Sequence, residues 1–177
     1  NKFRENKIAC AMYVIEVDGV VHAMLITHVD DLIWAVQPAY AQHIKAILSE
    51  FAVNDEKTKK NDFRFCGKEI KRLPSGNILV TCKDATECIG PINYSAEGRQ
   101  MSDLASQAEI TQMRSVIGSL GWIARQCRPD LSYDVSKGQS VVRKATVKDL
   151  KEANQALQQA KEFSERGLIF EAYAVCW

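Results

Sequence analysis

The sequence has no long apolar run and no excess of charge of one sign. Its 177 residues include 23 lysines and arginines against 22 aspartates and glutamates, a formal net charge of +1. Apolar runs such as AMLIT at 23–27 are far shorter than the ~20 residues that a helix needs to cross a bilayer. We therefore expect no membrane-spanning segment. The balanced total gives no global sign of nucleic-acid binding, although a local basic stripe would still allow it.

Common metal and phosphate motifs are missing as well. No two of the six cysteines have C-x-x-C spacing, the three histidines are not grouped with them, and no glycine-rich phosphate loop occurs. A zinc site is therefore not expected. Irregular cysteine spacing without a secretion signal favours reduced, mostly structural cysteines, so we predict an intracellular protein that is not secreted. The sequence begins at Asn1 without a methionine, which we interpret as the start of a fragment or a processed product.

The first part of the chain is rich in β-forming residues. Residues 8–17 and 20–29 flank Asp18-Gly19, a strong two-residue hairpin signal. After the acidic pair Asp30-Asp31 the strand pattern resumes at 32–36. These features predict a three-stranded meander with the acidic pair at its second tight turn.

A helix and a second hairpin are expected next. Pro38 is a favourable first residue for a helix, and apolar residues at helical spacing continue to Phe51. A hairpin is predicted at 63–83 around the turn Pro74–Asn77. We expect this hairpin and the strands of the first part to form one antiparallel sheet.

The last part of the chain has a helical pattern. Residues 91–108 are predicted to be an extended linker, and the last ten residues form either a strand or a frayed tail. Apolar residues at helical spacing predict three helices between these segments, at about 110–124, 130–143 and 147–166. The predicted fold class is α+β, with antiparallel strands first and helices after them.

The acidic pair Asp30-Asp31 has the clearest potential for chemistry. Two adjacent carboxylates between buried-looking strands repel each other, so either water solvates them at an exposed turn or a hard divalent cation such as Mg²⁺ neutralises them. Neighbouring strand residues point to opposite faces, so both could bind one ion only where a turn redirects them. From the spacing alone, a solvated structural turn is the commoner outcome, and both alternatives stay open.

Four sequence blocks follow one another in a characteristic order. AMLITHVDDLIWA has a V-D-D turn between strands, and FRFCGKEIKRLPSGNILVTCKDATECI contains F-C-G-K-E-I. MRSVIGSLGWIARQCRPDLSYDVS and KDLKEANQALQQAKEFSERGLIF come after them. In order and approximate spacing, these blocks resemble the reverse transcriptases of copia-type long-terminal-repeat retrotransposons. The resemblance covers nearly the whole chain, although His28 replaces the family's aromatic residue before V-D-D and Cys66 replaces a leucine.

This resemblance implies the C-terminal half of a reverse transcriptase domain, an RNA-directed DNA polymerase. Residues 1–90 would be the later part of a polymerase palm, with a catalytic hairpin and a primer-grip-like hairpin, and residues 91–177 a linker and a helical thumb or connection region. Asp30 would be the principal ligand for Mg²⁺ (or Mn²⁺), assisted by Asp31. The family's other metal-binding aspartate, the fingers and the first half of the palm would lie upstream, so we expect this chain to be inactive alone.

The resemblance also implies partners. The intact enzyme would bind an RNA or DNA template–primer duplex and deoxynucleoside triphosphates, in a cytoplasmic virus-like particle or in the nucleus. In the primer-grip-like hairpin, Phe65, Gly67, Lys68 and Arg72 would contact the nucleic acid. The alternative for this segment is an ordinary amphipathic hairpin with Gly67 at a bulge. For the whole chain, the alternatives are a non-catalytic nucleic-acid-binding remnant and a structural domain whose Asp-Asp turn binds nothing.

Several residues of the helical part are weaker candidates. Cations there could contact a duplex, although helix dipoles also explain cations near helix ends: Arg125, Arg128, Lys137, Arg143 and Lys144. Trp122 is expected to pack in the core rather than stack on a base. Gly118 and Gly121 are expected to allow close helix packing.

Overall fold

The structure, a computed structural model, describes residues 3–5, 11–29, 31–50 and 59–172. Its contacts divide the chain into two compact units, Asn1–Cys66 and Gly67–Trp177. The division at residue 90 that the sequence suggests separates a palm part from a thumb part, and it stays a prediction. Each unit is described by itself.

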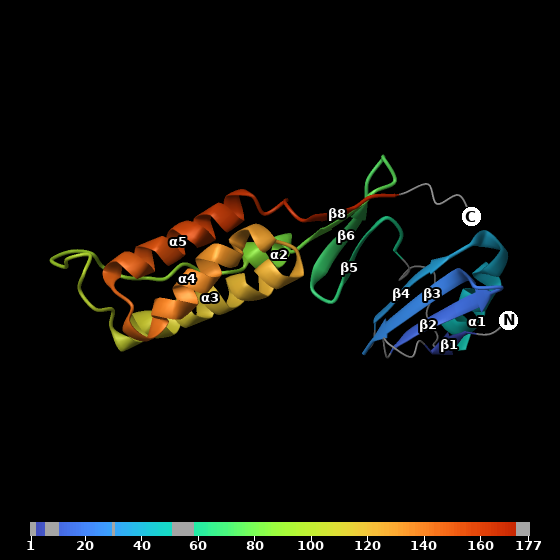
Figure 1. Cartoon of the computed structure of the whole chain (residues 1–177), viewed down its shortest axis with the longest axis horizontal. Coiled ribbons are helices and arrows are strands. Elements are labelled where there is room, and N and C mark those ends of the chain that lie inside the picture. Colours follow the sequence, from blue (N-terminus) through green and yellow to red (C-terminus); the bar gives the residue numbers. More distant parts are fainter. Residues whose placement is uncertain (1–2, 6–10, 30, 51–58, 173–177) are drawn as a thin grey trace. The chain divides into compact units, whose positions relative to one another are not determined.

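The first unit contains a four-stranded antiparallel sheet in the order β1-β2-β3-β4 (Figure 1). Its strands are β1 (Arg4–Glu5), β2 (Met12–Val17), β3 (Val20–His28) and β4 (Asp31–Val36). Asp18 and Gly19 join β2 to β3 with φ angles of 52° and 80°, as a two-residue hairpin turn requires. The predicted meander is confirmed for the described residues, with β1 as an additional edge strand. Residues 8–10 of the predicted first strand lie outside the described residues.

One face of this sheet is buried. The cross-strand pairs Ile15–Ala23 and Leu25–Trp34 place these side chains on a common face, because directly opposed residues point the same way. Ile15, Ala23 and Leu25 are at most 5% exposed. On the opposite face, Met24 is 38% exposed.

The segment after β4 begins with η1 (Pro38–Tyr40) and continues as α1 (Ala41–Glu50). Pro38 occupies the first turn, as predicted. His22 of β3 fixes this segment, because its ring stacks on Tyr40 with centroids 4.7 Å apart and its Nδ1 lies 2.7 Å from Oε1 of Gln37. Phe51, the predicted end of the helix, lies outside the described residues.

A second antiparallel sheet has the order β5-β6-β7-β8. Its strands are β5 (Asp62–Phe65), β6 (Lys68–Arg72), β7 (Ile78–Thr81) and β8 (Leu168–Phe170). The prediction of one sheet is therefore wrong. Hairpin patterns specify which residues share a face but not which strand edges pair. The edge of β7 pairs with β8, where Leu79 lies opposite Ile169, 90 residues further along the chain. The C-terminal segment thus forms a strand through Phe170.

The helices of the second unit are α2 (Lys83–Glu87), α3 (Gln107–Gln126), α4 (Ser132–Val141) and α5 (Val147–Glu162), with 3-10 turns η3 (Pro129–Leu131) and η4 (Val142–Lys144) around α4. In Figure 1, α3, α4 and α5 lie side by side. The three predicted long helices are confirmed, with changed ends. Ser106 caps α3 through a capping box with Glu109, so the helix begins earlier than its apolar pattern.

The core of the second unit lies between these helices. Leu120 of α3 and Leu150 of α5 have no exposed surface. The predicted linker has no helix or strand from residue 91 to residue 106, and its last two residues belong to α3. Its start is fixed to α5: Ile92 is 3% exposed, its N–H donates to Oδ1 of Asn154 over 2.8 Å, and its carbonyl accepts from Nδ2 of Asn154 over 2.9 Å. Among the described helices, none is long and apolar enough to cross a membrane.

Candidate functional site

The turn between β3 and β4 carries the predicted catalytic pair. His28 lies opposite Asp31, so only two residues join the strands. Val29 has φ of 50° and is 90% exposed, and Asp31 is exposed as the first residue of β4. Asp30 lies outside the described residues. The structure thus places Asp31 at an exposed tight turn, as the sequence predicted, and the position of Asp30 stays a prediction.

Val29 makes this turn different from two others in the chain. Asp18-Gly19 and Cys66-Gly67 also have positive φ angles, but their second residue is glycine, which adopts these angles freely. Val29 is β-branched and is followed in the sequence by an aspartate. A β-branched residue at positive φ is a strained outlier whose cost is of order 1–3 kcal/mol. The pairing of β3 with β4 must therefore compensate the free-energy cost of this backbone conformation at Val29.

The described residues do not by themselves make a site for Mg²⁺ or Mn²⁺. Within the described ranges, no three His, Cys, Asp or Glu side chains are grouped so that they could hold a metal ion. Asp31 offers the hard carboxylate oxygens that such ions prefer, but further ligands would have to join it. A metal site here would need Asp30 and groups from elsewhere.

Three of the predicted nucleic-acid-binding residues lie at or next to the turn from β5 to β6: Phe65, Gly67 and Lys68. Phe65 is half-buried at the end of β5, in the first unit. Gly67 has φ of 75°, and a Cβ at this position would lie 3.3 Å from Cη2 of Trp122. Cys66 and Gly67 form a two-residue turn rather than the bulge considered as an alternative. Glycine is needed here both for the positive φ and for the approach to the indole ring.

Two of the predicted cations share one face of β6. Side chains alternate along a strand, so Lys68 and Arg72 point the same way and Lys71 points the opposite way. Lys68 Nζ donates to Oε1 of Gln126 on α3 over 3.0 Å. Arg72 is exposed. This face of β6 is therefore linked to the C-terminal end of α3.

The other face of β6 is tied to the start of α2. Glu69 Oε2 accepts hydrogen bonds from Oγ1 of Thr81, its direct cross-strand partner, and from the backbone N–H of Lys83 at 3.0 and 2.8 Å. These bonds fix the β6–β7 hairpin to the helices of the same unit.

Helix α3 presents one exposed face that carries cations and no carboxylate. At 3.6 residues per turn, six of the residues from Arg114 to Arg125 fall within less than half of the helix circumference. We call them the α3 face: Arg114, Ser115, Gly118, Ser119, Trp122 and Arg125. The single acidic residue of α3 in the sequence is Glu109. Its carboxylate is buried and accepts hydrogen bonds from Arg99, the nearer at 2.7 Å, and from the N–H of Ser106. The α3 face therefore has a positive charge that no acidic residue of α3 offsets.

These bonds also determine how Glu109 titrates. The Arg99 guanidinium first, and then the hydrogen bonds from Ser106, lower the pKa of Glu109 from 4.5 to about 2. Glu109 is therefore charged at neutral pH, and its carboxylate is paired with Arg99 rather than with a cation of the α3 face.

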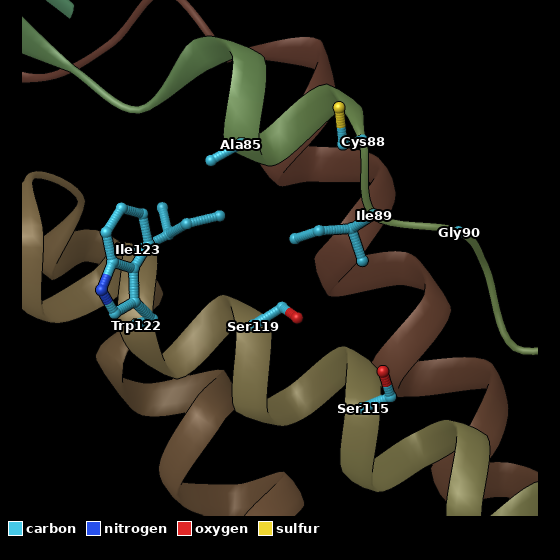
Figure 2. Close-up of a pocket in the computed structure, with 8 residues that line it drawn as sticks. All are labelled: Ala85, Cys88, Ile89, Gly90, Ser115, Ser119, Trp122 and Ile123. Carbon is cyan, nitrogen blue, oxygen red and sulfur yellow. The ribbon is translucent and has the colours of Figure 1, made fainter. Parts of the chain in front are cut away.

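A groove of about 370 Å³ borders the α3 face. Figure 2 shows Ala85 and Ile89 on one side and Ser119, Trp122 and Ile123 on the other. Among the described residues that line it, none is charged. Trp122 is half-buried between this groove and the turn at Gly67, so it packs as predicted and still keeps part of its surface accessible.

Arg128 was a candidate for duplex contacts, and the structure contradicts this. Its side chain is 2% exposed, and its guanidinium donates to the Asp130 carboxylate, the closest contact being 2.8 Å. Nη1 donates to the carbonyls of Ala160 and Phe163 at 3.3 and 2.7 Å. Arg128 thus caps the C-terminal end of α5, which ends at Glu162 rather than 166.

Of the two glycines of α3, one has the predicted role and the other does not. A Cβ on Gly121 would lie 3.3 Å from Val135 of α4, so this glycine allows close packing as expected, whereas a Cβ on Gly118 would have nothing within 4 Å. Gly118 therefore faces open space. The sequence analysis missed Arg114, Ser115 and Ser119. The absence of acidic residues from one side of α3 was the available signal for them.

No protein-family model matches the chain, and neither a curated protein nor a solved structure matches it at a significant level.

Proposed function

We propose that this chain is the C-terminal half of a copia-type reverse transcriptase domain, which would perform RNA- or DNA-templated nucleotidyl transfer in the intact enzyme. The observation that carries the proposal is the V-D-D turn, in which Asp31 is exposed at a tight hairpin and Val29 has a strained backbone conformation. Strained residues persist where the surrounding structure imposes them, and they cluster at functional sites. A merely structural hairpin would be better served by Asn-Gly or Asp-Gly, as at Asp18-Gly19.

The second support is the set of cations on the α3 face and β6 of the second unit. The α3 face, Arg72 and the groove beside Trp122 combine cations with small polar residues and a partly accessible aromatic ring. Phosphates attract such cations, and small residues allow a bulky backbone to approach closely. A template–primer duplex is a partner of this chemistry, and the bond from Lys68 to Gln126 links the β6 cations to the same helix.

In the proposed enzyme, Asp30 and Asp31 would contribute carboxylates to a site for Mg²⁺ or Mn²⁺. Such ions neutralise charge and orient the reacting groups in phosphoryl transfer. Because the described residues supply too few ligands, the upstream part of the polymerase would have to provide at least one more carboxylate. This chain alone would therefore bind the ion weakly and would not extend a primer.

The test is primer extension by this chain joined to the upstream palm and fingers of a copia-type reverse transcriptase. We expect Mg²⁺-dependent incorporation of deoxynucleotides. Asp30→Asn should abolish incorporation and Asp31→Asn should lower its rate, because each removes a charged ligand. Asp18→Asn is the matched control, since it makes the same change at the other hairpin turn of the sheet and should leave the rate unchanged.

Circular dichroism of each variant gives the folding control. A folded Asp30→Asn enzyme with full activity would contradict the catalytic assignment. An inactive unsubstituted chimera that still binds the duplex would favour the non-catalytic nucleic-acid-binding remnant.

A further inference from the structure

The first sheet ends in an edge strand that lacks the usual protections against pairing. Among the described strands, β4 pairs with β3, and none pairs with its other edge. Natural edge strands are protected by shortness, by lysine or proline, or by a bulge. β4 has six residues, DLIWAV, without lysine or proline. Its register with β3 runs without a shift from the pair His28–Asp31 to the pair Ala23–Val36.

The opposite edge of the same sheet is protected. β1 has only two residues, Arg4 and Glu5, and both are charged and exposed. A strand this short offers few backbone groups to a partner, and its charges oppose the burial that pairing would bring. Of the two edges of this sheet, β4 therefore offers the longer and more apolar template for another strand.

The backbone groups of β4 that point away from β3 belong to alternate residues. In an antiparallel pair, every second residue exchanges hydrogen bonds with the partner strand, and the residues between them point their N–H and C=O groups outward. The N–H of Gln37, which continues the register of β4, donates to the carbonyl of His22 over 3.0 Å. Counting back from this bond, the outward-pointing residues of β4 are Leu32, Trp34 and Val36.

These outward groups are symmetric about Trp34. When two copies of β4 meet antiparallel around a two-fold axis at Trp34, this residue faces its own copy and Leu32 faces Val36, so all the outward groups pair at once. The single charged residue of β4 is Asp31, which in this register lies opposite Gln37. Like charges therefore do not oppose each other across the strand pair.

We propose that the outer edge of β4 pairs with the same edge of a second copy of this chain, which joins the two sheets into one continuous sheet. The partner is a second copy because the outward groups, the apolar side chains and the single charge of β4 all match the same strand in reverse. The inference rests on the first sheet alone and goes beyond the proposed polymerase function. One strand pair is smaller than the about 1,200–2,000 Å² that stable complexes bury, so the dimer forms at high protein concentration.

Sedimentation velocity of the unsubstituted chain at increasing concentration tests the association. We expect the mass to rise from 19.8 kDa toward twice this value and no further, because a two-fold pair is closed and uses up the edge. A chain that stays monomeric up to the limit of its solubility would overturn the proposal. Growth into larger assemblies would also overturn it.

Amide hydrogen exchange locates the interface without any substitution. Where about nine-tenths of the protein is dimeric, the N–H groups of Leu32, Trp34 and Val36 should exchange about tenfold more slowly than in dilute protein, because they exchange only from the monomer. The N–H groups of Ile33 and Ala35 are the internal control, since they already point toward β3 and should change little. A dimer in which the outward N–H groups exchange as fast as in the monomer would overturn the proposal.

Charge variants test the register at Trp34. Trp34→Lys and Trp34→Glu each place like charges opposite each other at the two-fold axis and should weaken association by about tenfold or more. An equimolar mixture of the two variants should associate again, because a lysine then faces a glutamate. Met24→Lys, a matched control on the central strand β3, should leave association unchanged. Circular dichroism gives the folding control, and a folded Trp34→Lys chain that dimerises as the unsubstituted chain does would overturn the proposal.

Discussion

The helices of the second unit and the sheet of the first unit use their apolar residues differently. Leu120, Val147 and Leu150 have no exposed surface. In the first sheet, Met24 and Ile26 are 38% and 37% exposed on the face opposite Leu25. Helices α3 and α5 thus enclose apolar side chains completely, while the central strand of the first sheet leaves apolar side chains and a strained turn exposed. We infer that stability is concentrated in the helices and that the candidate catalytic turn lies on the less stable element.

The sharpest test of this contrast truncates one side chain in each unit. Leu120→Ala should lower the free energy of unfolding by about 3–5 kcal/mol, because it leaves a cavity in a closed core. Met24→Ala should change it by less than about 1 kcal/mol, because the side chain is already partly solvated. Urea denaturation followed by circular dichroism measures both. Equal losses for the two variants would remove the contrast.

Two glycines of the helices provide a smaller test with opposite signs. Gly138→Ala places a Cβ 2.6 Å from Cδ1 of Ile117, and such overpacking should cost about 1–3 kcal/mol. Gly118→Ala meets open space and should stabilise α3 by about 0.5–1 kcal/mol, because alanine favours a helix. Thermal unfolding of the two variants decides between them. Destabilisation by Gly118→Ala would mean that this position is packed after all.

The local signals in the sequence were sufficient for most of the helical unit. Ser106 and Glu109 have the spacing of a capping box. The residue types around Gly76 predict a turn. The burial of Arg128 could not be predicted, because the carbonyls that its guanidinium caps on α5 are more than 30 residues away. Single-residue types do not encode such long-range partners.

The sheets were harder to predict for the same reason. β1 has two residues and β8 has three, too few for an alternating pattern to be recognised, and the pairing of each depends on a distant edge. At the candidate catalytic turn, the sequence located the hairpin correctly. The sequence could not reveal the strain at Val29. The positive φ there arises because the paired strands leave only two residues between them, and the residue types do not specify that number.

The pH dependence of stability tests the ion pair at the start of α3. The pKa of Glu109 is lowered from 4.5 to about 2 in the folded protein, so the folded state binds fewer protons than the unfolded state between these values. Its stabilising contribution is complete above pH 4.5 and is lost as the pH falls toward 2. Glu109→Gln should flatten the stability profile in this window, as measured by urea denaturation at each pH. An unchanged profile would show that other carboxylates dominate.

Relief of strain at the candidate catalytic turn should give the smallest effect on stability. Val29→Asn should stabilise the protein by about 0.5–1 kcal/mol, because asparagine tolerates positive φ better than a β-branched residue. Val36→Asn, at the far end of β4, is a control that should not stabilise. The measurement is the midpoint of thermal unfolding. If Val29→Asn destabilises the protein, the side chain of Val29 has a role that its 90% exposure does not reveal.

The most direct test of the central claim is the salt dependence of binding between this chain and a template–primer duplex, followed by fluorescence anisotropy. We expect weak binding that falls steeply as salt rises, because phosphate contacts release counterions. Arg72→Glu and Arg125→Gln should each flatten the dependence, by about one unit of slope per lost phosphate contact. Lys71→Glu makes the same charge reversal on the opposite face of β6 and should leave the slope nearly unchanged. Salt-independent binding, or no binding at low salt, would contradict the proposed nucleic-acid interface.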